Sequence, residues 1–364
     1  MVSIFWYKGD NKNMEKKVTV IITAYNSEKF LEKSISSILQ QTFGFNNIEL
    51  VLVDDCSQDK TQDIINDYVN KYDNVKSVIL DENSGSPGKP RNLGMDAATS
   101  DYIMFLDADD EYDLNCVEKL YDEITATNAD IVCCNVAMKV GDTVYAPIKF
   151  QEEKTEFDPL FNRNFFSKAV WDKIYSVKFL NEHNIRFPEY QIFEDVHFIA
   201  NISLNSPKVI SLNNYFGIFN FYLNDDEYQS MTHTLSYRNI KMTFEGFKSE
   251  FDLFENIDYD ISSKFLSGDL DIYLAQYLKF VGSNKKDENF VTTFDNLRNL
   301  ELETKFDLNP LTLWGKIANR LILNNHKTLF YYFSKLVFRV LNSKILYKFY
   351  LKRNFKVIEN VMGI

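Results

Sequence analysis

Three aspartates, Asp107, Asp109 and Asp110, stand within four residues of one another, directly after the apolar run of residues 102–106. A short unbroken apolar run predicts a strand buried on both faces of a mostly parallel sheet. Open α/β sheets bind ligands at the carboxyl ends of such strands. Crowded carboxylates repel one another, and Mg²⁺ or Mn²⁺ held by one or two carboxylates and by substrate phosphates would relieve that repulsion. We therefore predict that Asp107 and Asp109 belong to a metal and nucleotide site.

A helix cap is the plainer explanation for part of this cluster. A helix is expected to begin near Asp113, and one aspartate before it would accept hydrogen bonds from its first N–H groups. A cap needs a single side chain. It accounts for Asp110 or Asp113 and leaves Asp107 and Asp109 to the metal and nucleotide.

The strand before these aspartates is one of four expected in the first part of the chain. The mostly apolar runs that predict them are residues 18–23, 48–53, 75–80 and 102–106. Helical patterns lie between them, which is the alternation of βαβ units, so a doubly wound parallel sheet is predicted at least through Cys133. Asp54 and Asp55, which end the second run, would then lie at the same sheet edge as Asp107.

The first helix between these strands is expected to have Ser27 as its N-cap and an apolar stripe behind it. The residues of that stripe are Leu31, Ile35, Ile38 and Leu39. A second helix is expected at 59–72, and a third after the Gly/Pro-rich loop NSGSPGKP.

Length and composition indicate a folded protein of two domains. The chain has 364 residues, of which 45% are hydrophobic and 15% aromatic. The cysteines, Cys56, Cys116, Cys133 and Cys134, lack zinc-like spacing, so reduced structural thiols are expected. No segment has the pattern of a signal peptide or a membrane span. A cytoplasmic protein is therefore expected.

The last part of the chain is basic, whereas the rest is acidic. Residues 311–364 contain ten Lys or Arg and one acid, out of 40 basic and 52 acidic residues in all. An apolar stripe lies there at helical spacing: Leu329, Phe333, Leu336 and Val340. We assign the stripe to packing in a helical bundle, against the first domain or in a homo-oligomer. The excess charge is assigned to an anionic membrane surface or a phosphate-rich polymer, with simple solvation as the alternative. Nucleic acid is not an expected partner.

Three motifs, taken in order, resemble one known family. VTVIITAYN, LVLVDDCSQDKT and PRNLGMDAATSDYIMFLDADD together resemble the nucleotide-binding half of the family 2 glycosyltransferases. The resemblance implies a GT-A fold, which is an α/β fold with a mostly parallel mixed sheet flanked by helices, followed here by a mainly α-helical C-terminal domain. The boundaries it suggests are an N-terminal extension at 1–13, a catalytic domain at 14–233 with halves at 14–134 and 135–233, and a basic helical domain at 234–364.

The resemblance also implies how the donor is bound. Ala24 and Tyr25 would line a uracil pocket, Asp54 would accept a hydrogen bond from the uracil ring, and Arg91 would face the nucleotide. Asp107 would lie near the ribose and the metal, with Asp109 as the main metal ligand. The residues expected to contact the nucleotide sugar are Thr23, Ala24, Tyr25, Asn26, Glu28, Asp54, Asp55, Ser86, Arg91, Asp107, Ala108 and Asp109.

Two of these roles have plainer alternatives. Asp54 could be an ordinary turn aspartate, and Arg91 could form a salt bridge with the acidic cluster at one stage and contact the diphosphate at another. The sequence also departs from the family pattern, since Cys56 stands where Gly is frequent and Pro90 where Ala is frequent. These departures leave the local loop geometry open.

The stretch around Glu194 and Asp195 continues the resemblance, which implies that Asp195 is the base and that Glu194 positions the substrate. The alternative is that both are favourable acids in the first turn of a helix. His183 and His197 are expected to be structural. His233 is a candidate third metal ligand, with an ordinary loop histidine as the alternative, and Ser230 is a weaker candidate for a phosphate contact.

These features predict a metal-dependent, non-processive, inverting glycosyltransferase. It would move a hexose or N-acetylhexosamine from a UDP-sugar to a hydroxyl of a surface glycan, a lipid-linked glycan or a polyol-phosphate polymer such as teichoic acid. One alternative is a sugar-phosphate nucleotidyltransferase, although TAYNSEKF lacks the Gly-rich loop expected for that class. The other is an inactive scaffold that binds UDP-sugars or glycans.

Overall fold

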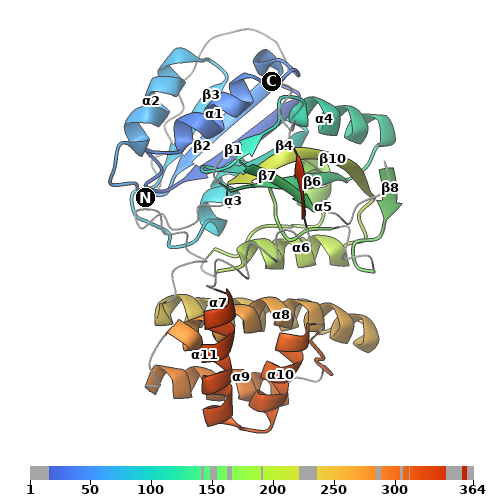
Figure 1. The fold of residues 1–364 in the computed structure, drawn as a ribbon. Helices are drawn as coiled ribbons and strands as arrows, with labels where there is room; N and C mark the ends of the chain where they lie inside the picture. The colour runs from blue at the N-terminus through green and yellow to red at the C-terminus, as the bar shows by residue number, and fades with distance from the viewer. Residues whose placement is uncertain are drawn as a thin grey trace. The chain divides into compact units, whose positions relative to one another are not determined.

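The described part of the chain forms two compact units (Figure 1). The first contains the sheet and consists of the described residues up to 189 together with 201–220 and 355–358. The second contains 192–200 and the helices between 236 and 341. The residues that the computed structural model describes are 16–140, 143–147, 154–161, 166–189, 192–220, 236–283, 288–303, 306–310, 312–341 and 355–358.

The four predicted strands are present and parallel, in the order β4-β1-β2-β3. Their bounds are β1 Val18–Ala24, β2 Ile48–Asp54, β3 Val75–Ile79 and β4 Tyr102–Asp107. Every residue of β2 is buried, as expected for a central strand covered on both faces.

Helices cover both faces of these strands. They are α1 Leu31–Leu39, α2 Thr61–Lys71, α3 Gly88–Ala97 and α4 Cys116–Thr127. The apolar sides of α1, α2 and α4 share one core with Val20 and Ile22 of β1. α3 lies on the opposite face, where Gly94 approaches so closely that a Cβ there would be 2.4 Å from Cγ2 of Ile21. The prediction of a doubly wound arrangement is thus confirmed for these strands.

Two predicted helix starts are wrong. α1 begins at Leu31, its N-cap is Phe30, and no side chain caps it. Ser27 instead begins a turn, because its N–H donates to Oγ1 of Thr61 at 2.7 Å and its carbonyl accepts from Leu31 at 3.0 Å. α4 begins at Cys116 after Asn115, again without a side-chain cap, so neither Asp110 nor Asp113 caps it.

Beyond β4 the sheet becomes mixed, although the predicted strand that contains Cys133 still runs in the same direction as β4, because the strand between them is antiparallel to both. The antiparallel strand β9 Lys173–Ser176 lies between β4 and β6 Ile131–Val140. β10 Val209–Asn220 pairs with β6 in parallel and with β5 and β8 in antiparallel. The remaining elements of this unit are β5 Glu111–Tyr112, β7 Thr143–Pro147, β8 Lys154–Phe157, the 3₁₀ turn η1 Phe45–Asn47 and α5 Val177–Glu182.

The second unit is helical. Its helices are α7 Tyr237–Leu253, α8 Tyr259–Ser283, α9 Glu288–Glu303, α10 Leu313–Leu323 and α11 Lys327–Leu341, with the first part of α6 Glu194–Leu204. The long helix α8 is central, since α7, α10 and α11 all pack against it. None of the helices in the described part of the chain is long and apolar enough to cross a membrane.

The structure adds two details about the basic end of the chain. The stripe on α11 is not its packed face, because Leu329 and Leu336 are exposed, whereas Phe330 and Val337 are buried. Val340 carries no described side chain. After the helices the chain returns as a strand, β11 Phe355–Ile358, which pairs antiparallel with β7 in the first unit. All four cysteines are free, as predicted.

Candidate active site

Several predicted site residues meet at the carboxyl edge of the parallel strands. Ala24 of β1 pairs with Asp54 of β2, and Thr23 pairs with Asp107 of β4. Asp55 follows Asp54 directly, so all five residues lie at the edge where α/β sheets bind ligands. This grouping follows from the parallel register alone.

The loops after β1 and β2 are joined by reciprocal hydrogen bonds. Asn26 N–H donates to Oγ of Ser57 at 2.8 Å, and Oδ1 of Asn26 accepts from the N–H of Gln58 at 2.8 Å. Oε2 of Glu28 accepts from the N–H of Lys60 at 3.0 Å. Asn26 and Glu28 therefore join the two loops, and Tyr25 between them keeps 49% of its surface exposed.

Asp54 is fully buried and has one oxygen without a partner. Its Oδ2 accepts from the N–H of Ser57 at 3.0 Å and from Nε2 of Gln62 at 2.8 Å. Its Oδ1 is buried and has no hydrogen-bond donor in the described part of the chain. A buried acceptor left unsatisfied is costly, so this oxygen is suited to a donor supplied by a ligand.

Asp55 and Ser86 shape the loop before α3. Asp55 accepts from the N–H of Ser84 at 2.8 Å, from its hydroxyl at 2.9 Å and from Nδ2 of Asn83 at 3.0 Å. Burial raises the pKa of the Asp55 carboxyl, although the bonds from Ser84 oppose that shift. Ser86 is buried, and its carbonyl accepts from the Ser84 hydroxyl at 2.7 Å.

Arg91 is held between a carboxylate and an aromatic ring. Nη2 of Arg91 lies 2.8 Å from Oδ1 of Asp107, and the guanidinium carbon lies 5.4 Å from the centre of the Phe187 ring. Phe187 is fixed by Asn92, whose amide donates to its carbonyl at 2.8 Å and accepts from its N–H at 2.9 Å. The salt bridge considered for Arg91 is therefore formed. Asn92 and Phe187 were not predicted as site residues.

The turn that carries Asp107 and Asp109 is held by α1. The hydroxyl of Ser34 contacts the carbonyl oxygens of Ala108 at 2.6 Å and Asp110 at 2.7 Å. No group of three or more His, Cys, Asp or Glu placed to hold a metal is found among the described residues. Two carboxylates nevertheless fit Mg²⁺ or Mn²⁺, which take oxygen ligands and complete their shell with phosphates and water.

Both departures from the family pattern have a local explanation. Cys56 adopts a left-handed conformation with φ of +63°, which glycine reaches more easily. Pro90 is the third residue of α3, in the first turn, where its missing N–H has no helical acceptor to lose.

Glu194 and Asp195 lie in the second unit, in the first turn of α6. Glu194 is buried, and Oδ1 of Asp195 accepts from the N–H of Val196 at 2.8 Å. Phe193, just before them, has a φ of +65°, an unusual conformation for a bulky side chain, and packs edge-on against Tyr273 with ring centres 5.3 Å apart. Such strain is frequent at functional sites.

The histidines with described positions make structural contacts. Nδ1 of His197 lies 3.1 Å from the hydroxyl of Ser249, and burial lowers the pKa of His197 to about 4. The ring of His183 packs on Phe179 with centres 4.8 Å apart. His233 and Ser230 lie outside the described residues.

Comparisons with known proteins agree with the resemblance. The family model described as "Glycosyl transferase family 2" matches residues 19–180. The poly(ribitol-phosphate) beta-N-acetylglucosaminyltransferase TarS of Staphylococcus aureus (strain Mu50) is 32% identical over 194 residues, which are 53% of this chain and 33% of that protein. An uncharacterized glycosyltransferase of Haemophilus influenzae is 32% identical over 184 residues, which are 49% of this chain and 70% of that protein.

A solved structure agrees in fold. The crystal structure of S. aureus TarS 1-349 in complex with UDP-GlcNAc superposes with a TM-score of 0.67 at 22% identity, over 89% of this chain and 91% of that one. The predicted GT-A fold with a helical C-terminal region is thereby confirmed. The chain spans about a third of the length of the first curated relatives that it matches. These matches, together with the strand-end site, establish that the chain belongs to glycosyl transferase family 2.

Proposed function

We propose that the protein transfers a hexose or N-acetylhexosamine from a UDP-sugar to a hydroxyl of a polyol-phosphate or related surface-glycan acceptor, with inversion at the anomeric carbon. The observation that carries this proposal is the buried Oδ1 of Asp54, which no donor in the described residues reaches, at the same sheet edge as the Arg91–Asp107 ion pair. A nucleotide with a ring N–H donor and a diphosphate matches both features.

In this proposal the uracil ring lies against Tyr25, and its ring N–H donates to Oδ1 of Asp54. Tyr25 is exposed and is supported by two loops that bond to each other, so its ring is available for stacking without a change of fold. Arg91 then neutralises diphosphate charge, which requires its guanidinium to share or leave Asp107. Phe187 limits where the guanidinium can go.

Asp107 and Asp109 would hold a divalent cation in this proposal. When bound, Mg²⁺ or Mn²⁺ would stabilise the negative charge of the departing UDP. The role of the chain itself is to fix the two carboxylates by the turn that Ser34 holds. His233 remains a candidate third ligand.

Asp195 is proposed as the general base. Its carboxylate would remove the proton from the acceptor hydroxyl while that oxygen attacks the anomeric carbon and the bond to UDP breaks. One displacement inverts the configuration. Glu194 would position the acceptor. Support comes from the partial exposure of Asp195 at a helix start and from the strained Phe193 before it.

The acceptor and sugar classes rest on the relatives. TarS is described as acting on poly(ribitol-phosphate) and transferring N-acetylglucosamine. We propose the same acceptor chemistry here, with N-acetylhexosamine as the first sugar to test.

The test is release of UDP from a panel of UDP-sugars, with a poly(polyol-phosphate) acceptor and with or without Mn²⁺. We expect turnover of one donor that depends on metal, is abolished in Asp109→Ala and is retained in Asp122→Asn, a matched change at an exposed aspartate of α4. Asp195→Asn should bind UDP like the wild type but lose turnover. Absence of UDP binding would contradict the proposal, as would release of pyrophosphate from UTP and a sugar phosphate.

A further inference from the structure

Exposed apolar side chains are concentrated on α10 and α11. Residues 312–341 hold seven of the twelve large apolar side chains that are exposed in the described part of the chain. Scattered exposed apolar residues need no explanation, but a concentration of them indicates an interaction surface. We call the following set the hairpin face: Leu313, Trp314, Ile317, Leu329, Tyr332 and Leu336.

The two helices present this face as one surface. The rings of Trp314 on α10 and Phe333 on α11 are in contact, with centres 5.6 Å apart. The other sides of the helices are packed, through Ile322 of α10 and Phe330 of α11, both fully buried. The packed sides hold the helices in the unit, so the exposed apolar stripes are not needed for its core.

On α10 and α11 themselves, the charged side chains that border the hairpin face are all positive; the carboxylate of Asp271 on α8 also lies at the start of α10, where it accepts from the N–H and hydroxyl of Thr312. Lys316 and Arg320 flank it on α10, and Lys335 and Arg339 flank it on α11, at the three- and four-residue spacings that place side chains on adjoining sides of a helix. Residues 312–341 contain no Asp or Glu, although the whole chain has a net charge of −12. Apolar residues with Trp and Tyr beside Lys and Arg are typical of helices that lie in a membrane interface.

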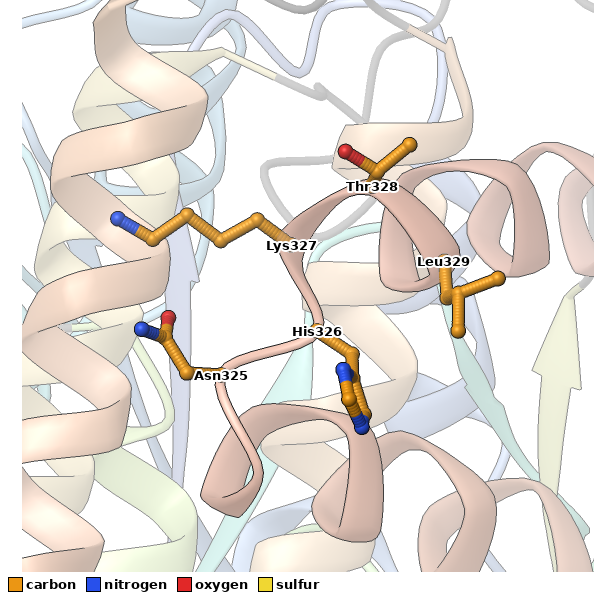
Figure 2. Close-up of a pocket in the computed structure, with 5 residues that line it drawn as sticks. All are labelled: Asn325, His326, Lys327, Thr328 and Leu329. Carbon is orange, nitrogen blue, oxygen red and sulfur yellow. The ribbon is translucent and has the colours of Figure 1, made fainter.

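The pocket at the turn between the two helices does not account for this charge. It is lined by residues 325–329, and Figure 2 shows Lys327 pointing to one side of the turn and Leu329 to the other. Nζ of Lys327 lies 2.7 Å from the Asp295 carboxylate. The lysine of the pocket is therefore neutralised within the protein, whereas Leu329 continues the apolar face.

We propose that the hairpin face lies on an anionic lipid surface, with its apolar side chains at the level of the head groups and its basic side chains on lipid phosphates. A soluble polyanion would pair with the basic residues but leave the apolar ones exposed to water. A second copy related by two-fold symmetry would bring the same basic border against itself. An anionic bilayer matches both the apolar and the charged part.

The experiment is co-sedimentation of the full chain with two kinds of vesicle, phosphatidylcholine alone and phosphatidylcholine mixed equally with phosphatidylglycerol. Binding to the anionic vesicles only, weakened by salt, is expected. Changing Lys316, Arg320, Lys335 and Arg339 to Gln should weaken binding by roughly fivefold for each residue, and so by more than about a hundredfold together.

A second variant, Leu329→Ser/Tyr332→Ser/Leu336→Ser, should also abolish binding while the charges remain. The matched controls are Lys241→Gln/Lys248→Gln on α7 and Leu302→Ser on α9, which are exposed elsewhere and should bind like the wild type. Unchanged circular dichroism would show that the variants are folded. The proposal would be overturned by a chain that ignores anionic vesicles, by variants that bind them normally, or by light scattering that shows a dimer dissolved by the serine changes.

Discussion

Asp54→Asn should weaken UDP binding while leaving the fold almost unchanged. The two carboxylate oxygens differ, since Oδ2 accepts two hydrogen bonds inside the protein and Oδ1 accepts none from the residues that the structure describes. An amide oxygen can take the place of Oδ2 and keep the bonds from Ser57 and Gln62. The amide nitrogen must then take the place of Oδ1, where it points a donor at the ring N–H of the ligand.

The size of the effect follows from that exchange. A hydrogen bond to a charged group contributes about 1.5–3 kcal/mol, so losing it should weaken UDP binding by about 10- to 150-fold. The free energy of unfolding should change by less than about 1 kcal/mol without ligand, because both internal bonds persist. Replacing this one oxygen by nitrogen should thus weaken UDP binding and leave the stability of the fold nearly unchanged.

Calorimetric titration with UDP and with pyrophosphate, combined with urea unfolding, would measure both quantities. Pyrophosphate has no ring N–H and should bind the variant and the wild type equally. Asp63→Asn, an exposed position on α2, is the matched control. If Asp54→Asn bound UDP normally, or lost UDP and pyrophosphate alike, Asp54 would be an ordinary turn aspartate and the uracil assignment would be refuted.

Two further predictions concern stability. Because burial lowers the pKa of His197 to about 4 from 6.5, the unfolded chain binds a proton between these values that the folded protein does not, and the wild type loses stability as pH falls. His197→Asn should remove this loss, so the difference in the free energy of unfolding between the two proteins should shrink by about 2 kcal/mol from about pH 7 to about pH 5. Urea unfolding at several pH values would measure this difference, and parallel pH profiles would contradict the prediction. Cys56→Gly should raise the free energy of unfolding by up to about 1 kcal/mol, because glycine adopts a positive φ without strain, whereas Cys56→Ala should not raise it. If urea unfolding gave the same change in free energy for both variants, the backbone at Cys56 would be unstrained.

The first four strands could be predicted because each is a mostly apolar run, and the four follow one another at a spacing typical of βαβ units. β9 could not, since it is four residues long and includes the buried Lys173, whose charge hides the apolar pattern. Its ammonium is satisfied by Asp172 at 2.5 Å and by the carbonyl of Ala169 at 2.6 Å. Ser27 was predicted to be a cap from its neighbours alone, whereas in the structure its N–H donates to Thr61, the first residue of α2.

Within the site, the gathering of Asp54 and Asp107 was predictable, because parallel strands bring their ends together. The place of Phe187 was not, since it meets Asn92 across 95 residues and no local pattern indicates the contact. On α11 the apolar residues occupy two sides of the helix, and the periodicity does not distinguish the packed side of Phe330 from the exposed side of Leu336.

The return of β11 to the sheet has a consequence for folding during synthesis. β7 leaves the ribosome early, but its partner β11 follows about 200 residues later. Until then one edge of β7 has unpaired N–H and C=O groups, which another chain could occupy. A nascent chain of this protein should therefore be most prone to aggregation while the residues between β7 and β11 are being made, after its first strands have formed and before residues 355–358 close the edge.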